Sequence, residues 1–147
     1  MRKLLALDPG VTTGFSIFSW EVRYTYKAVF PLDWGNLSIE DLLPKIASLL
    51  EQDCYHVIYE NIPLIGVGNL GDSLRKVMGI IHTLAPKATV TNPGVWKTFP
   101  SLENLPTPEV EKTTLHQKDA YYIGLWYIIT QPPKNSKISL SFSNFQL

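Results

Sequence analysis

Short runs of apolar residues, separated by turn signals, dominate the first part of the chain. Residues 4–7 (LLAL) form a continuous apolar run that ends at Asp8, which is typical of a strand buried on both faces. Residues 14–20 (GFSIFSW) and 22–30 (VRYTYKAVF) are rich in β-branched and aromatic residues, so they predict two more strands. Because the links between the three runs are short, we expect an antiparallel meander.

Apolar residues then recur at helical spacing. A helix is expected from residue 38 or 41 to residue 52, and Asp41 is its expected N-cap because proline is tolerated only in a first turn, where Pro44 would then lie. Residues 55–59 (YHVIY) predict a fourth strand, which ends at Glu60.

The second half of the chain predicts two further helices and one strand. Residues 61–71 contain three glycines and a proline and predict a loop, after which Asp72 caps a second helix. Residues 87–91 predict a fifth strand, and residues 109–129 a last helix. Residues 132–147 are expected to form a loosely held tail. The apolar stripe of the second helix consists of Leu74, Val77, Met78, Ile81 and Leu84.

The element order βββαβαβα predicts an α/β fold with a mixed five-stranded sheet and helices on both faces. The 147 residues suit one domain, expected over residues 1–131, and 45% apolar with 18% charged residues is a globular composition. One cysteine excludes an intrachain disulfide framework, and no run resembles a signal peptide or a transmembrane helix. We therefore expect a soluble, cytoplasmic protein.

Acidic residues follow two of the predicted strands. If the first and fourth strands are parallel neighbours, their ends lie about 5 Å apart, and Asp8 and Glu60 share one small volume. His116 and Asp119, three positions apart, share one face at the start of the last helix. Three carboxylates suit two hard cations that promote phosphodiester hydrolysis, and His116 could bind metal or could orient or deprotonate the attacking water.

Each of these residues also has an ordinary structural explanation. Asp8 precedes a proline and a glycine and could serve a turn, Glu60 could be a solvated charge at a strand end, and His116 with Asp119 could be an exposed helical pair. Only their conjunction, at places that a βαβ topology brings together, favours a catalytic site.

Four segments in order resemble one family. Residues 5–15 (LALDPGVTTGF) are similar to the first strand and turn of the RuvC-type Holliday junction resolvases, which belong to the ribonuclease H-like superfamily. Residues 57–61 (VIYEN) resemble their second acidic strand end, and residues 90–97 (VTNPGVWK) resemble their fifth strand with its Pro-x-x-x-Lys. His116 and Asp119 resemble their C-terminal metal motif. The order and approximate spacing hold up to the predicted tail.

The resemblance implies a ribonuclease H-like fold and a Mg²⁺- or Mn²⁺-dependent endodeoxyribonuclease of DNA recombination and repair. Such enzymes act as homodimers that nick two opposed strands of a four-way junction. Carried over by position, the catalytic residues and ligands of the two metal ions are Asp8, Glu60, His116 and Asp119. The loop after Glu60 is expected to approach the junction. The residues expected to bind DNA are Asn61, Arg75, Lys76, Lys97, Lys112 and Lys118.

The charge distribution is uneven. The net charge is zero, but residues 1–60 hold five basic and eight acidic residues, and residues 61–147 hold eight basic and five acidic ones. Since bound metal would neutralise the proposed acidic ligands, the second half offers a positive face for DNA. Any single lysine here could equally be ordinary solvated surface.

Two alternatives remain open from the sequence. Only 18 residues separate Lys97 from His116, and the 61–71 loop lacks an aromatic residue, so a ribonuclease H-like nucleic-acid-binding module with weak or lost cleavage is possible. Residues 8–14 (DPGVTTG) also resemble the phosphate-binding hairpin of actin-like ATPases, which need two such domains. Four aromatic residues offer either interface or core: Trp96, Tyr121, Tyr122 and Trp126.

Overall fold

The computed structural model of the protein describes residues 1–52, 55–62, 70–100, 102–108, 113–134 and 136–146. Lys112, Glu109 as the expected start of the last helix, and most of the 61–71 loop lie outside these residues. The elements follow in the order β1 (Arg2–Asp8), β2 (Thr13–Arg23), β3 (Tyr26–Leu37), α1 (Ile39–Glu51), β4 (Tyr55–Glu60), α2 (Leu70–Leu84), β5 (Thr89–Thr91), α3 (Pro93–Trp96), the 3₁₀ helix η1 (Leu102–Asn104), α4 (Leu115–Thr130) and β6 (Lys137–Leu140).

The strands of the described chain form one mixed sheet in the order β5-β4-β1-β2-β3-β6. β1 to β3 are an antiparallel meander, while β4 runs parallel to β1 and β5 runs parallel to β4. The expected meander and the expected parallel pairing of the first and fourth strands are both confirmed. The sheet therefore places the carboxyl ends of β1 and β4 side by side.

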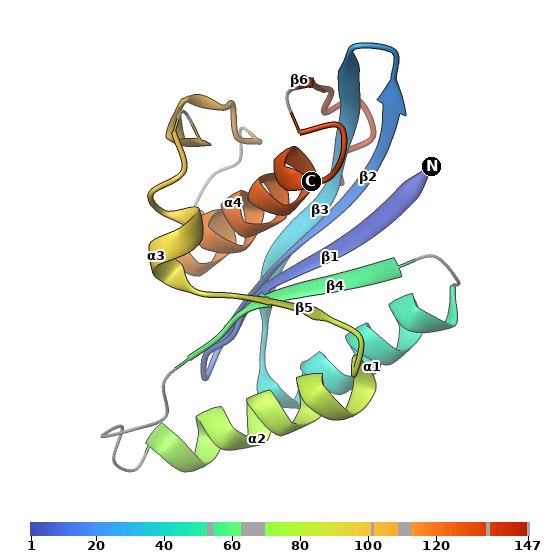
Figure 1. Ribbon diagram of the computed structural model, residues 1–147. Coiled ribbons are helices and arrows are strands. Elements are labelled where there is room, and N and C mark those ends of the chain that lie inside the picture. The colour runs from blue at the N-terminus through green and yellow to red at the C-terminus, as the bar shows by residue number, and fades with distance from the viewer. Residues whose placement is uncertain (53–54, 63–69, 101, 109–112, 135, 147) are drawn as a thin grey trace.

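Helices cover both faces of this sheet, as the sequence predicted. Figure 1 shows α1 and α2 together on one side and α4 lying across the other. The apolar run of β1 serves both layers: Leu5 and Leu7 pack in the core with α1 and α2, and Leu4 and Ala6 pack in the core with α4. The stripe predicted for α2 is confirmed, because Leu74, Val77, Met78 and Ile81 are buried.

Two predicted strand boundaries were wrong. The run 22–30 is not one strand, because the chain turns at Tyr24 and Thr25 between β2 and β3. Tyr24 has a φ of 45° and is fully exposed at this turn. The aromatic and β-branched pattern is continuous across the turn, so it could not reveal where one strand ends and the next begins.

Helix starts were also displaced from their predictions. Ser38, rather than Asp41, caps α1, and its hydroxyl accepts a hydrogen bond from the Asp41 N–H at 3.3 Å. Pro44 is consequently the sixth helical residue. Its missing N–H cannot donate to the carbonyl of Glu40, a residue that lies on the exposed side of the helix. In α2, Asp72 lies within the first turn and not before it.

The last helix begins later than residue 109. Thr114 caps α4 through a capping box: its hydroxyl accepts from the Gln117 N–H, and the Gln117 side chain accepts from the Thr114 N–H at 2.8 Å. This cap sets the register of α4, and with it the position of the residues of the first turn.

The segment 132–147, predicted as a loose tail, completes the sheet. β6 pairs in parallel with β3 and raises the strand number of the described sheet from the expected five to six. Phe142 and Phe145 pack against the α4 core, and the Phe145 ring meets Trp34 edge-on at 6.0 Å. In the sequence, these two phenylalanines stand among serine and asparagine residues, and that polar composition led to the prediction of a loosely held tail.

Two of the four aromatic residues that offered either core or interface are core residues. Trp96 and Tyr121 are buried, while Tyr122 and Trp126 are partly exposed. In the described chain, no helix is both long enough and apolar enough to span a membrane.

Candidate active site

Asp8 and Glu60 lie at one edge of the sheet because β1 and β4 end there together. Leu7 pairs with Tyr59 in the parallel register, so the next residue on each strand is acidic. The two acids are 7% and 8% exposed. Two carboxylates are thus held in a nearly buried position, where unpaired charge is costly.

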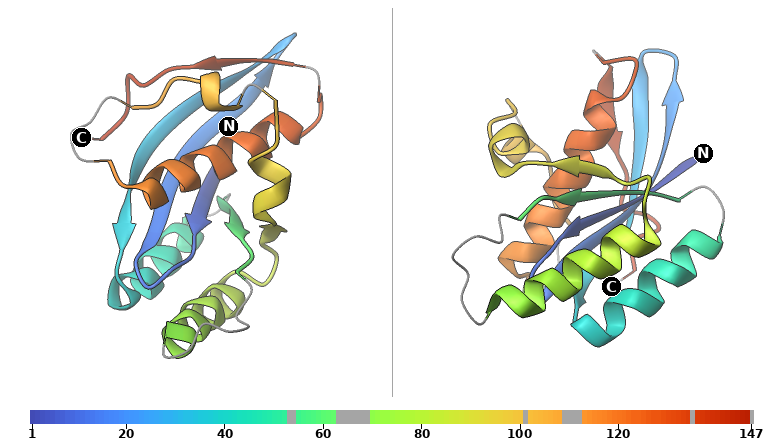
Figure 2. Two further views of the ribbon diagram at one scale, coloured as in Figure 1. Left: turned by 90° about the vertical axis from the view of Figure 1, so that its left-hand side faces the viewer. Right: turned by 60° about the horizontal axis from the view of Figure 1, so that its bottom comes forward.

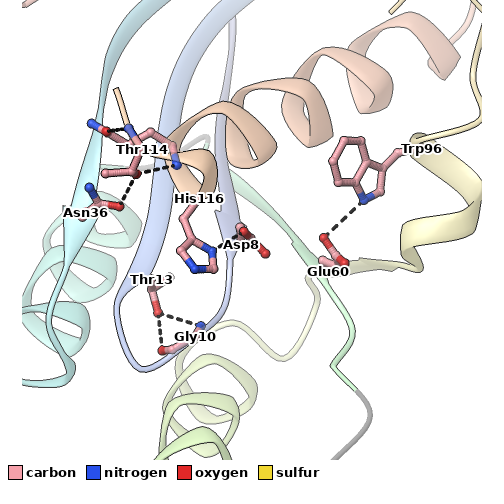
Figure 3. Close-up of polar contacts among 9 residues, drawn as sticks. Asp8, Gly10, Thr13, Asn36, Glu60, Trp96, Thr114 and His116 are labelled. Atoms are coloured by element: carbon pink, nitrogen blue, oxygen red, sulfur yellow. Dashed lines mark hydrogen bonds and ion pairs between the residues drawn. The ribbon is translucent and has the colours of Figure 1, made fainter. Parts of the chain in front are cut away.

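The first two turns of α4 add His116 and Asp119 to the same edge. Nδ1 of His116 lies 2.6 Å from Oδ2 of Asp8, within hydrogen-bond distance (Figure 3). Asp119 follows one turn later and is close enough to Asp8 for the negative charge of that residue to act on it. The structure therefore brings together all four residues that the sequence assigned to catalysis.

A close approach between α4 and β2 makes this arrangement possible. A Cβ atom at Gly14 would lie 2.2 Å from the carbonyl oxygen of His116, so any larger residue would push the helix away. On the same side, the Thr114 hydroxyl is 3.2 Å from the side-chain oxygen of Asn36 on β3. The glycine after the β1–β2 turn therefore positions His116.

The turn that follows Asp8 is held by two hydrogen bonds. The Gly10 N–H donates to the Thr13 hydroxyl at 3.4 Å, and that hydroxyl donates to the Gly10 carbonyl at 3.2 Å (Figure 3). Thr13 is 1% exposed. The Pro-Gly-x-x-Thr pattern after the first acid, which ends at Thr13, thus serves as a rigid support for it.

Burial raises the pKa of all three acids, and repulsion adds to the rise at Glu60 and Asp119. For Glu60 and Asp119, burial is the largest cause and the negative charge of Asp8 the next. Burial also raises the pKa of Asp8, although its bond with His116 opposes the shift. Raised pKa values among neighbouring acids mean that the site holds more negative charge than its surroundings solvate well.

Lys97 and Trp96 complete the site from α3 and the residue after it. The positive charge of Lys97 opposes the rise in pKa at each of the three acids, which places it near all of them. The Trp96 indole N–H donates to Oε2 of Glu60 at 3.3 Å (Figure 3). The aromatic character of Trp96 alone predicted only a core or interface role. The signal for its polar contact is that a buried indole N–H needs an acceptor.

The other expected DNA contacts are scattered. Lys118 is exposed beside Asp119, and Asn61 is exposed directly after Glu60, with its N–H donating to the Thr91 carbonyl at 2.7 Å. Arg75 and Lys76 are exposed on α2, in the other helical layer, where Arg75 forms an ion pair with Asp72 at 3.4 Å. Lys97, Lys118 and Asn61 thus border the acidic site, and Lys112 lies outside the described residues.

The donors of this site suit a hard divalent cation. They are carboxylate oxygens with a neighbouring imidazole, and added positive charge would relieve their mutual repulsion. Among the described residues, no three His, Cys, Asp or Glu side chains already stand close enough to hold a metal ion. One oxygen of Asp8 is engaged by His116 and one of Glu60 by Trp96. The chemistry of the donor set fits a metal.

Comparison with known proteins gives similarity in structure without similarity in sequence. No protein-family model and no curated protein matches the chain. Solved structures do match. RuvC from Thermus thermophilus, in complex with a Holliday junction substrate, has a TM-score of 0.68 at 12% identity, covering 93% of this chain and 99% of that one.

Two further structures agree with this match. Thermus thermophilus RuvC in a second structure has a TM-score of 0.69 at 12% identity and covers 92% of this chain and 98% of its own. The fowlpox virus resolvase in complex with Holliday junction DNA has a TM-score of 0.55 at 13% identity, with 88% and 99% covered. The chain therefore has a RuvC-like resolvase fold, which confirms the resemblance seen in the sequence motifs.

Proposed function

We propose that this protein is a metal-dependent, structure-selective DNA endonuclease that resolves four-way junctions. One observation carries the proposal: Asp8, Glu60 and Asp119 converge where parallel strands end and α4 begins. Ligand sites in α/β sheets lie beyond the carboxyl ends of parallel strands. The likeness of the fold to solved junction resolvases supports the substrate class.

Asp8, Glu60, Asp119 and His116 are the residues that would hold two Mg²⁺ or Mn²⁺ ions. When bound, such ions supply an activated water and charge stabilisation of the leaving oxygen in an in-line displacement. The chain provides oxygen donors on two strand ends and one helix, which fixes them relative to each other without depending on a loop.

His116 and Lys97 have different roles in this proposal. His116 fixes Asp8 through its Nδ1, which leaves its Nε2 free to orient a water or to accept its proton. The ammonium group of Lys97 pairs with a phosphate next to the acids, and it lowers their repulsion before DNA binds. Lys118 and Asn61 extend this surface on either side.

Two copies of the chain are needed to cut two opposed strands. The described chain holds one acidic site, and a four-way junction has a pair of equivalent strands related by a two-fold axis. A homodimer whose two sites are related by a two-fold axis matches this symmetry. Size-exclusion chromatography with light scattering, with and without junction DNA, tests this part of the proposal.

The main test is cleavage of a synthetic four-way junction against linear duplex of the same sequence, in Mg²⁺ or Mn²⁺ and in EDTA. We expect symmetric nicks confined to the junction, with none in EDTA. Equal cutting of the linear duplex would contradict structure selectivity, and cutting in EDTA would contradict the role of metal.

A second candidate is a junction-binding protein with weak or lost cleavage. It is favoured by the hydrogen bonds that already engage Asp8 and Glu60, and by the absence of a ready-made group of three metal donors in the described part of the chain. Selective junction binding with no nicks in either metal would support this candidate over the nuclease.

A further inference from the structure

A pocket of about 400 Å³ opens beside the acidic site, between α3, η1 and α4. Asp119 lines the pocket and is also one of the three acids of the site, so the pocket and the site are adjacent. Its volume lies in the range of sites that take small organic groups. The residues that line it are Trp96, Lys97, Leu102, Glu103, Leu115, Lys118, Asp119 and Tyr122.

The lining combines flat apolar surface with charge at the opening. Tyr122 is the partly exposed aromatic ring of the lining, and Leu115 is 71% exposed although it is apolar. Trp96 is only 3% exposed, and the Lys97 ammonium lies over its ring at 5.3 Å. Two exposed lysines, Lys97 and Lys118, stand beside these apolar groups. Aromatic surface with adjacent cations is the combination that binds unpaired bases together with their phosphates.

Glu103 gives the pocket a hydrogen-bond acceptor. Burial first, and then the negative charges of Glu103 and Asp119, raise the pKa of the Tyr122 hydroxyl, so both carboxylates lie near that ring. Asp119 is part of the acidic site, whereas the exposed Glu103 is free to face a ligand. A carboxylate accepts from the amino group of cytosine, adenine or guanine, which thymine lacks.

We infer that this pocket receives an unstacked nucleobase next to the phosphate that is cut, and that Glu103 favours a base carrying an amino group. The inference rests on the proposed function and deepens it. Because the pocket shares Asp119 with the acidic site, its occupant is within about one nucleotide of the reacting phosphate. A branch point lowers the cost of unstacking a base, which is smallest where pairing is already lost.

The pocket is also built by the short segment that leads into α4. Leu102 and Glu103 come from the short stretch between Lys97 and His116, and Leu115 opens the helix that follows. Base preference at the cut is therefore expected to reside in this segment.

The test uses four-way junctions that are identical except for the nucleotide flanking the cleaved phosphate, which is A, C, G, T or abasic. Single-turnover cleavage rates are measured with the 147-residue chain, and junction affinity is measured in EDTA. Removing the base should slow cleavage about 5- to 100-fold, the range that base stacking supplies. Thymine should be cut more slowly than cytosine.

Matched variants test which side chains of the pocket cause these differences in cleavage rate. Glu103→Gln should remove the preference for cytosine over thymine, and Leu115→Ser should reduce the penalty of an abasic position. Glu51→Gln and Leu43→Ser alter an exposed acid and an exposed leucine on α1, and both should behave as wild type.

The outcomes distinguish failure of the base pocket from failure of the proposed nuclease function. Junction cleavage at equal rates for all five substrates, unchanged in Glu103→Gln, would overturn the pocket while leaving the nuclease intact. A protein that neither binds nor cuts branched DNA would overturn the proposed function and the pocket with it.

Discussion

His116 Nδ1 and Asp8 Oδ2 are 2.6 Å apart, although 108 positions separate the two residues in the chain. This contact joins the end of β1 to the first turn of α4, the two elements that must meet for the acidic site to exist. It also gives the most buried acid a partner that can orient it. The contact therefore couples assembly of the site to the docking of the last helix.

Asp8→Asn should abolish junction cleavage and leave the fold intact. An asparagine keeps the shape of the side chain and its hydrogen bond to His116, but it removes the charge that a divalent cation requires. His116→Gln should lower the cleavage rate about 10²–10⁴-fold, the usual contribution of a general base. Single-turnover rates in Mn²⁺, with circular dichroism as the folding control, check both. Wild-type rates in Asp8→Asn would exclude the proposed site.

Asp119→Asn should make the metal-free protein more stable at neutral pH. The pKa of Asp119 is raised above its ordinary value of 3.8 by burial and by Asp8. The folded state therefore keeps a proton that the unfolded state has lost, so the contribution of this group to stability falls as the pH rises through the folded-state pKa. An asparagine stays neutral throughout.

Thermal melts in EDTA between pH 3 and pH 8 measure this effect. The two proteins should melt together near pH 3, and the variant should lead by about 2–4 °C at pH 7.5, which corresponds to about 1 kcal/mol. Adding Mg²⁺ at pH 7.5 should stabilise the wild type and close the gap. A variant that melts lower at every pH would show that the Asp119 carboxylate is stabilising instead.

The sequence predicted the residues of the acidic site better than it predicted the contacts that hold those residues in place. Asp8 and Glu60 each end an apolar run, and parallel neighbours must bring such ends together, so topology alone locates them. The contacts of Trp96 with Glu60 and of Gly14 with the backbone of α4 depend on how elements dock in three dimensions. No spacing along the chain carries that information.

Gly14→Ala should impair both stability and cleavage. The added Cβ would overlap the His116 carbonyl, 2.2 Å away, and that neighbour is backbone, which cannot rotate aside. The first turn of α4 would shift and carry His116 and Asp119 with it. We expect a loss of about 1–3 kcal/mol, the usual cost of overpacking, together with a large loss of activity.

Gly79→Ala is the matched control for this variant. A Cβ at Gly79, in α2, would meet nothing within 4 Å, and alanine is the better helix former. Denaturant unfolding should place Gly79→Ala at or above the wild type and Gly14→Ala well below it. Equal stability of the two variants would contradict the close packing of α4 on β2.

Lys27→Met should destabilise the protein without affecting the chemistry directly. The Lys27 side chain is completely buried, and its Nζ donates to the carbonyls of Ile128 and Ile129 at 2.8 and 3.1 Å, and to that of Gln131. It thus caps the end of α4 opposite the site. Methionine fits the space but removes the donor that these carbonyls share, and among the described residues only the Ile128 carbonyl keeps a partner, the Gln131 N–H at 3.3 Å. The expected cost is about 1.5–3 kcal/mol.

Lys137→Met is the matched control, which tests whether the loss of an exposed lysine lowers stability as much as the loss of the buried Lys27. Lys137 is exposed on β6, so its loss should change the unfolding free energy little. Urea titrations compare the two variants with the wild type. A Lys27→Met protein as stable as Lys137→Met would mean that the α4 carbonyls find other donors.

Truncation after Gln131 should destabilise the protein and promote its association. The deletion removes β6, which leaves the edge of β3 open, and it removes Phe142 and Phe145 from the core. Two half-buried phenylalanines contribute about 2–3 kcal/mol, and an open strand edge favours pairing between molecules. Phe145→Ala should show part of the stability loss with no association, while Asn144→Ala, at an exposed position, should match the wild type. Melting curves and light scattering distinguish these outcomes. If the truncated chain has the same melting temperature as the 147-residue chain, residues 132–147 contribute nothing to stability.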